Sequence, residues 1–207
     1  MNNINRLIII LSFFILGCTP DLIVENKVTK QINSLDLNIF SKNGEKKYSI
    51  KSPYSTYDNV MDKFQFQKST INIFQNGKVK YIINSEEAIL SDNKKFLELK
   101  SNVKLKTIEQ DEEYLYADNF IWDLNKSYYL LTGNVRFENR NVILTSGRAM
   151  LGLDNIIEFF NPVKYIIKDN NNENKYEVNS ENAYYDINQE SLSFEAKDKR
   201  VRSIINF

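Results

Sequence analysis

Few residues of this chain are of a type that does chemistry. Histidine is absent and Cys18 is the only cysteine, so the sequence offers neither the commonest general base nor a zinc cluster. No GxxxxGK[ST] or GxGxxG motif occurs, which excludes the usual nucleotide-binding loops. The 27 acidic and 27 basic residues are interleaved, and we expect them to be solvated charges along strands. The sequence therefore predicts no enzyme, no catalytic residue, no metal and no cofactor, and the lack of a basic stripe argues against nucleic acid.

Cys18 is the one residue with a specific chemical prediction. It follows an apolar run from Leu7 to Leu16, which begins after Arg6. Such a run rises about 15 Å as a helix against a hydrocarbon core of about 30 Å, so it has the shape of a secretory signal. The Ile-Leu-Gly-Cys sequence is similar to a bacterial lipobox, which implies cleavage before Cys18 and a diacylglyceryl group on its thiol. Two or three acyl chains would anchor the protein firmly. The alternative is a signal anchor in which Cys18 is only a buried small residue.

The chain is expected to have three parts. Residues 1–17 are the lipoprotein signal peptide, residues 18–38 a tether, and residues 39–207 a β-domain. The tether is either extended or a short amphipathic helix, because four of its aliphatic residues have helical spacing: Val24, Val28, Ile32 and Leu35.

A four-residue motif recurs about every 30 residues in the β-domain. A shift of 32 residues places residues 85–103 on residues 117–135 without a gap. Two further copies begin at Ser146 and Ser180. In each copy apolar and polar residues alternate, and a turn rich in Asn and Asp follows, which predicts a β-hairpin. We expect four hairpins in one continuous sheet, after upstream strands at 46–52, 63–67 and 70–75.

Stacked hairpins can bury the apolar faces that a lone hairpin leaves exposed. The predicted fold class is all-β, with two facing layers around an elongated apolar interior. The lining is expected to be Phe64, Phe66, Ile71, Ile73, Leu90, Leu97, Leu99, Phe120, Trp122, Leu131, Val135, Phe137, Leu151 and Phe159. Periodicity alone does not distinguish a closed, filled core from an open groove.

The repeats and their order resemble the LptC family among the LptA/LptC/LptD-type periplasmic proteins. An anchor comes first, then a tether, then a Gly- and Tyr-containing strand at 44–50, an aromatic strand at 64–66 and the four repeats. The resemblance covers residues 35–205. It implies a twisted β-jellyroll of stacked antiparallel strands, open on one side, that binds lipopolysaccharide or a similar amphiphilic lipid. It also implies an inner-membrane ABC transporter (LptB/LptF/LptG-like) that delivers the lipid and an LptA-like bridge protein that receives it.

Two features bear on location and partners. A lipobox takes the place of the transmembrane helix of the best-known LptC proteins, and Thr19 is not the Asp associated with inner-membrane retention. The expected location is the periplasm, lipid-anchored, on the inner membrane. The C-terminal residues either fray or form an edge for a partner strand, with four apolar side chains: Val201, Ile204, Ile205 and Phe207.

Two other functions fit the same sequence. A soluble LptA-like bridge would share the fold, although lipidation at Cys18 argues against it. A surface or periplasmic lipoprotein that acts as an adhesin or structural spacer would need only a closed β core.

Overall fold

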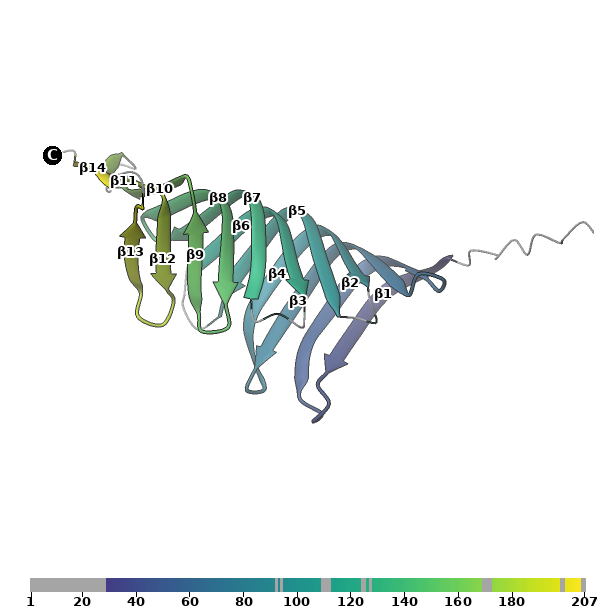
Figure 1. The fold of residues 1–207 in the computed structure, drawn as a ribbon. Coiled ribbons are helices and arrows are strands. Elements are labelled where there is room, and N and C mark those ends of the chain that lie inside the picture. Colours follow the sequence, from purple (N-terminus) through teal and green to yellow (C-terminus); the bar gives the residue numbers. More distant parts are fainter. Residues whose placement is uncertain are drawn as a thin grey trace, which may run out of the picture.

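The computed structural model describes residues 29–91, 93, 95–108, 113–123, 126, 128–168, 173–197 and 200–205. Within these residues every regular element is a strand, and fourteen strands form one antiparallel sheet (Figure 1). Their bounds are β1 Thr29–Phe40, β2 Lys46–Asp58, β3 Lys63–Gln75, β4 Lys78–Ser91, β5 Phe96–Thr107, β6 Glu113–Asp123, β7 Tyr128–Asn139, β8 Val142–Gly152, β9 Ile156–Phe160, β10 Val163–Lys168, β11 Asn174–Ser180, β12 Asn182–Asp186, β13 Ser191–Glu195 and β14 Arg202–Ile205. The expected all-β, jellyroll-like fold is confirmed.

The strand order follows the chain over most of the sheet. Each strand from β1 to β7 pairs with the next, and β8 pairs with both β9 and β10. Beyond β8 the sheet therefore splits into two branches, β9–β12–β13 and β10–β11–β14. The sheet is open: β1 is its edge at one end, and β13 and β14 are the edges of the two branches at the other.

Each long strand contributes to two layers. In β4, residues 81–84 and residues 87–91 both pair with β5, and the register shifts between them. The same interruption recurs between β5 and β6, β6 and β7, and β7 and β8. The strands bend at these points, and the sheet folds over on itself (Figure 1).

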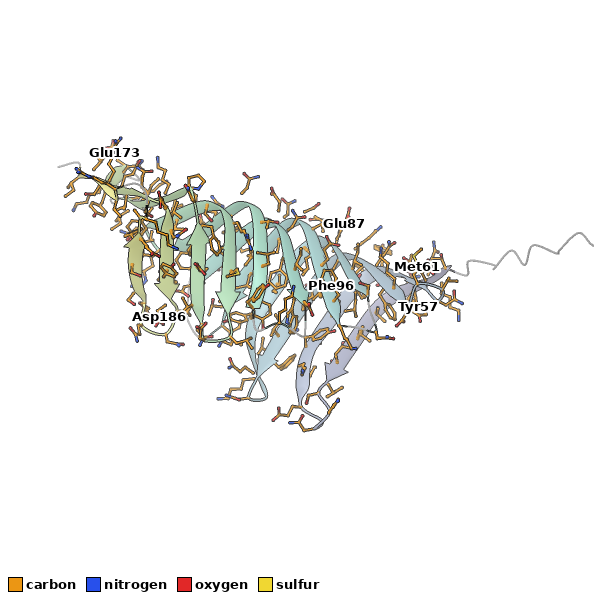
Figure 2. The ribbon with its side chains drawn as sticks, in the orientation of Figure 1. Tyr57, Met61, Glu87, Phe96, Glu173 and Asp186 are labelled. Carbon is orange, nitrogen blue, oxygen red and sulfur yellow. The ribbon has the colours of Figure 1, made fainter. Side chains whose placement is uncertain are left out.

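The bends lie along one side of the folded sheet, and the turns between strands lie along the other. The first layer holds the strand halves next to the β3–β4, β5–β6 and β7–β8 turns, and it continues into β10. The second layer holds the halves next to the β4–β5 and β6–β7 turns, and it continues into β9. Figure 2 shows Glu87 on the side of the bends and Asp186 beside a turn on the opposite side. The layers are thus joined by backbone along the bends.

Left-handed backbone residues lie at the bends of alternate strands. Positive φ occurs at Ser34 in β1, at Lys68 in β3, at Ser101 and Asn102 in β5, and at Gly133 and Asn134 in β7. Gly133 (φ 76°) has a second constraint, because a Cβ there would lie 2.5 Å from Oδ2 of Asp118. Only glycine fits this bend without strain.

Serine hydroxyls mark the bends of β2, β4 and β8 and the junction of β11 with β12. Ser52, Ser146 and Ser180 each donate to the carbonyl oxygen two residues later, over 2.7, 2.8 and 2.9 Å. In β4 the hydroxyl of Ser85 lies 2.9 Å from that of Ser69 on β3. A bend interrupts the ladder, and a serine donor satisfies a carbonyl that would otherwise lose its partner. In the first three copies the recurring motif therefore lies in the middle of a strand (β4, β6 or β8), and in the fourth it joins β11 to β12, whereas the sequence suggested that it begins a hairpin.

Strand boundaries differ from the expected ones at two further places. Residues 63–67 and 70–75 form one strand, β3, which bends at Lys68. Residues 29–38 of the expected tether belong to β1, which pairs with β2 along its length. The physical reason is that Leu35, Leu37 and Ile39 pack against the core from alternate positions, which a strand allows and a helix does not.

Residues 1–28, with the expected signal peptide and Cys18, lie outside the described residues, as does Phe207. Of the residues that are described, none belongs to a helix long and apolar enough to cross a membrane.

Candidate functional site: the interior between the layers

The residues expected to line the interior come together there. All of them except Phe64 belong to one buried cluster, in which the most exposed, Trp122, is 7% accessible. Phe64 is partly buried and packs against the cluster. Leu90, Leu97 and Leu99 have no accessible surface at all. The side chains therefore fill the interior over β2–β9.

The sequence-based prediction missed much of the first layer. Its inward side chains include Tyr48, Ile50, Tyr81, Ile83 and Leu115, all at most 2% accessible. Their period-two spacing is a usable signal for these positions, although the bends separate them from the half strands that carry the predicted residues.

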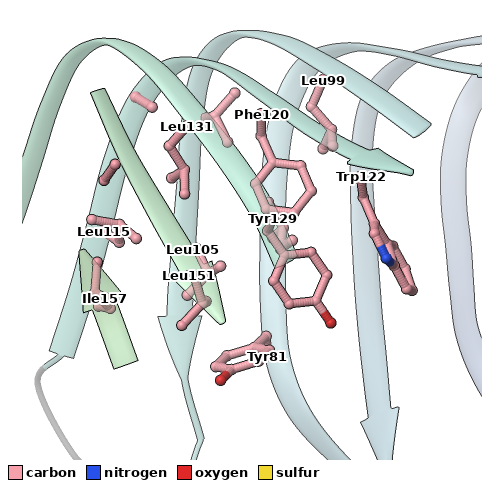
Figure 3. Close-up of a cluster of buried hydrophobic side chains, with 14 of the residues drawn as sticks. Tyr81, Leu99, Leu105, Leu115, Phe120, Trp122, Tyr129, Leu131, Leu151 and Ile157 are labelled. Carbon is pink, nitrogen blue, oxygen red and sulfur yellow. The ribbon is translucent and has the colours of Figure 1, made fainter. Parts of the chain in front are cut away.

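Aromatic side chains join the two layers on the side away from the bends. Leu99, Phe120 and Leu131 lie near the bends, and the hydroxyls of Tyr81 and Tyr129 point away from them (Figure 3). We call this line of contacts the seam. It consists of the ring pairs Tyr48–Trp122 (5.1 Å between centroids), Tyr81–Tyr129 (6.2 Å), Phe137–Tyr185 (4.6 Å) and Tyr165–Phe194 (5.4 Å).

A polar link crosses the seam near the middle of the sheet. Asn155, in the β8–β9 turn, accepts hydrogen bonds through Oδ1 from Lys80 and from Tyr81, the latter over 3.2 Å. Its Nδ2 donates to Asn188 within the second layer over 2.9 Å. Lys80 is only 7% accessible, which contradicts the expectation that the charged residues are solvated.

A buried carboxylate forms a second link. Glu113, at the start of β6, is 1% accessible and accepts hydrogen bonds from Asn139 (2.9 Å) and from Tyr185 of the other layer (2.5 Å). Both use Oε1, and Oε2 has no partner. Burial raises the pKa of Glu113, an effect that the two hydrogen bonds oppose and the negative charge of Glu190 reinforces. The sequence carried no signal for this residue, because a Glu at a strand end ordinarily faces water.

A cavity of about 250 Å³ lies between the layers at their C-terminal end. Its apolar part comes from β7, β8, β10 and β13, with Phe137, Leu144 and Leu192 among its walls. Its polar part includes Arg140 and Glu190. Asn139 and Tyr185, the hydrogen-bond partners of Glu113, also line the cavity. The remaining lining residues are Asn141, Val142 and Tyr165.

The predicted partner edge is the outer strand of the first layer at the same end. β14 pairs with β11 on one side. Val201, Ile204 and Ile205 are 44, 46 and 54% accessible, so apolar side chains lie exposed along this edge.

The described residues contain no group of three or more acidic, Cys or His side chains that could hold a metal ion. The titratable groups with raised pKa along the seam are tyrosines and Glu113; burial raises the pKa of Tyr129, for example, to about 12. These groups suit structural hydrogen bonds, and the arrangement as a whole offers an apolar interior with a polar rim.

A scan against protein families matches residues 9–152 to the model described as lipopolysaccharide-assembly, LptC-related. The match covers more than two thirds of the chain and ends with β8. A search of curated proteins gives no match. LptC proteins are lipid-transport components of the periplasm, associated with the inner membrane, and are not known as enzymes. The chain therefore belongs to the LptC family and has a role in the transport and assembly of lipopolysaccharide.

Proposed function

We propose that this chain is a lipid-anchored component of a lipopolysaccharide export system. It accepts lipid from an inner-membrane ABC transporter and passes it to an LptA-like bridge protein. The observation that carries the proposal is the continuous apolar interior between two layers of an open-ended sheet, in a member of the LptC family.

The interior must open to admit an acyl chain, because its own side chains fill it. Backbone connections join the layers along the bends, whereas the seam is closed by aromatic contacts and a few hydrogen bonds. Parting the layers at the seam would expose Trp122, Tyr129 and the leucines behind them. An acyl chain inserted there would replace the cross-layer contacts that are lost.

The energetics assign the protein a passive part in the transfer. Burying a methylene group contributes about 0.8 kcal/mol, so a twelve-carbon chain in water is disfavoured by about 10 kcal/mol. An apolar interior that solvates the chain nearly as well as a bilayer makes transfer possible but gives it no direction. Because the sequence has no nucleotide-binding motif, a partner ATPase must supply the driving force.

The order of elements suggests a direction along the sheet. β1 follows the proposed anchor at Cys18 and so lies nearest the membrane and the transporter. β13 and β14 lie at the far end, and the exposed edge of β14 would pair with a strand of the bridge protein.

A structural or adhesin lipoprotein is the alternative, and the filled interior is the observation that fits it. A spacer needs no ligand and would keep its seam closed. The family match favours lipid transport.

Purification from membranes in mild detergent separates the two functions. We expect mass spectrometry to find lipopolysaccharide bound to the protein and an ABC permease that co-elutes with it. A preparation with neither the lipid nor the permease would support the spacer and overturn the proposed function.

A further inference from the structure

The cavity between β7, β8, β10, β12 and β13 has two chemically distinct parts. One is apolar and continuous with the core, with walls that include Phe137, Leu144 and Leu192. The other is polar and carries one guanidinium and one carboxylate, Arg140 and Glu190. A lining divided in this way matches a molecule with an apolar chain and a polar head.

Two carboxyl groups lie at the polar part of the cavity or are bonded to its lining, Glu190 and Glu113. Glu113 is not itself a lining residue, but its Oε1 accepts hydrogen bonds from two residues that are, Asn139 and Tyr185, and its Oε2 has no partner. A buried acceptor without a donor destabilises a fold, so an acidic side chain here is an unfavourable choice for packing alone. Glu190 adds a second carboxylate to the same end of the cavity.

We infer that this cavity is a binding subsite for the junction of an acyl chain with a head group that donates hydrogen bonds. The chain lies against Phe137, Leu144 and Leu192. A hydroxyl or amide N–H of the head group bonds to Glu190 and, when the lining side chains Asn139 and Tyr185 move apart, to Oε2 of Glu113. This inference rests on the proposed function and names the place where lipid is held while the rest of the seam is closed.

Part of the lining of the subsite lies outside the family match. Tyr165, Tyr185, Glu190 and Leu192 lie beyond residue 152, where the family match ends. Among the described residues, the other buried side-chain polar atom without a partner is Oγ of Ser55. Ser55 lines a different pocket, whose other walls are mostly polar side chains such as Gln31, Asn33 and Gln67.

The test uses two detergents with the same twelve-carbon chain, dodecyl maltoside, whose head group donates hydrogen bonds, and dodecyldimethylamine oxide, whose head group has no donor. Calorimetric titration of the full-length protein below micelle-forming concentrations should show tighter binding of dodecyl maltoside. Glu113→Gln keeps an oxygen for Asn139 and Tyr185 but offers N–H groups in place of Oε2. It should weaken maltoside binding about tenfold or more and leave amine oxide binding unchanged. Ser55→Ala, which removes the other unpartnered buried oxygen, should change neither.

A second variant tests the chain-binding part. Leu192→Trp, at a partly buried position, should fill the cavity and weaken both detergents, whereas Leu153→Trp in the exposed β8–β9 turn should weaken neither. Equal maltoside binding by the wild type and Glu113→Gln, or no detergent binding by the wild type, would overturn the subsite. If lipopolysaccharide still co-purifies in that case, the proposed function stands and only this location is wrong.

Discussion

At the scale of single residues, the bends depend on a few backbone conformations that particular side chains permit. Gly133 is the sharpest case, because it combines a φ of 76° with the close approach of Asp118. Gly147 lies at the bend of the neighbouring strand β8, where an added Cβ would meet nothing within 4 Å and the φ is not left-handed.

The two glycines allow a matched comparison. Gly133→Ala should lower the free energy of unfolding by about 1–3 kcal/mol, because the new Cβ meets Asp118 in a strained backbone conformation. Gly147→Ala should change it by less than about 1 kcal/mol. Denaturant unfolding measures both, and equal losses would show that the bend of β7 does not depend on glycine.

Glu113 should make stability depend on pH. Its pKa is raised in the folded state above the ordinary value of 4.5, chiefly by burial. The stabilisation relative to Glu113→Gln is therefore full below that ordinary value and is lost as the pH rises through the folded-state pKa. Between pH 4 and pH 8, the unfolding midpoint of the wild type should fall relative to that of Glu113→Gln as the pH rises. Parallel profiles would mean that Glu113 titrates as an exposed carboxyl does.

Cys18 should carry the anchor. Cys18→Ala should leave the protein unprocessed and without lipid, because the thiol is the predicted acceptor of the diacylglyceryl group. Electrophoretic mobility and membrane extraction report the change, and the same mobility in both proteins would contradict the proposed lipobox.

At the scale of elements, the apolar alternation within each strand was predictable from sequence and the path of the strand was not. Residues such as Leu90 and Leu99 indicate an inward face, because period two is a local property of any half-buried strand. The position of a bend cannot be read from nearby residues, because a serine donor or a left-handed asparagine is equally suited to a tight turn between two strands. For this reason the repeated motif suggested the start of a hairpin. β1 was missed for a related reason, since its pairing with β2 is fixed by the partner strand.

The edge strand β14 gives the test at this scale. A double variant, Ile204→Lys and Ile205→Lys, should reduce co-purification of the bridge protein, because lysine on an exposed edge disfavours strand addition. The stability change should be within about 0.5 kcal/mol, as is usual for surface positions. The control is the pair Val60→Lys and Leu153→Lys, which carries the same charges on exposed apolar positions in turns. Equal capture by the two double variants would exclude β14 as the partner edge.

At the scale of the whole molecule, the open sheet explains how one chain can have both a folded core and a place for lipid. The layers are joined along the bends and meet at the seam, where Trp122 packs between Tyr48 and Tyr129. Sequence patterns could predict the apolar interior, but not that its side chains close it. Closure depends on contacts of β2 with β6 and of β7 with β12. The two strands of each pair are far apart in the chain and do not pair in the sheet. The buried link from Glu113 to Tyr185 belongs to the same class of long-range contact.

Trp122 is the only tryptophan of the chain and lies at the seam, so it reports on the interior without any substitution. Dodecyl maltoside with bromine atoms on its alkyl chain quenches tryptophan emission only on close contact. We expect the brominated detergent to quench Trp122 and the unbrominated one to leave its emission unquenched, at concentrations above those that fill the cavity between β7 and β13 and where calorimetry shows equal binding. Bound brominated detergent that leaves the emission unchanged at these concentrations would show that the chain does not enter the interior beside Trp122 and that the interior over β2–β8 is a closed core.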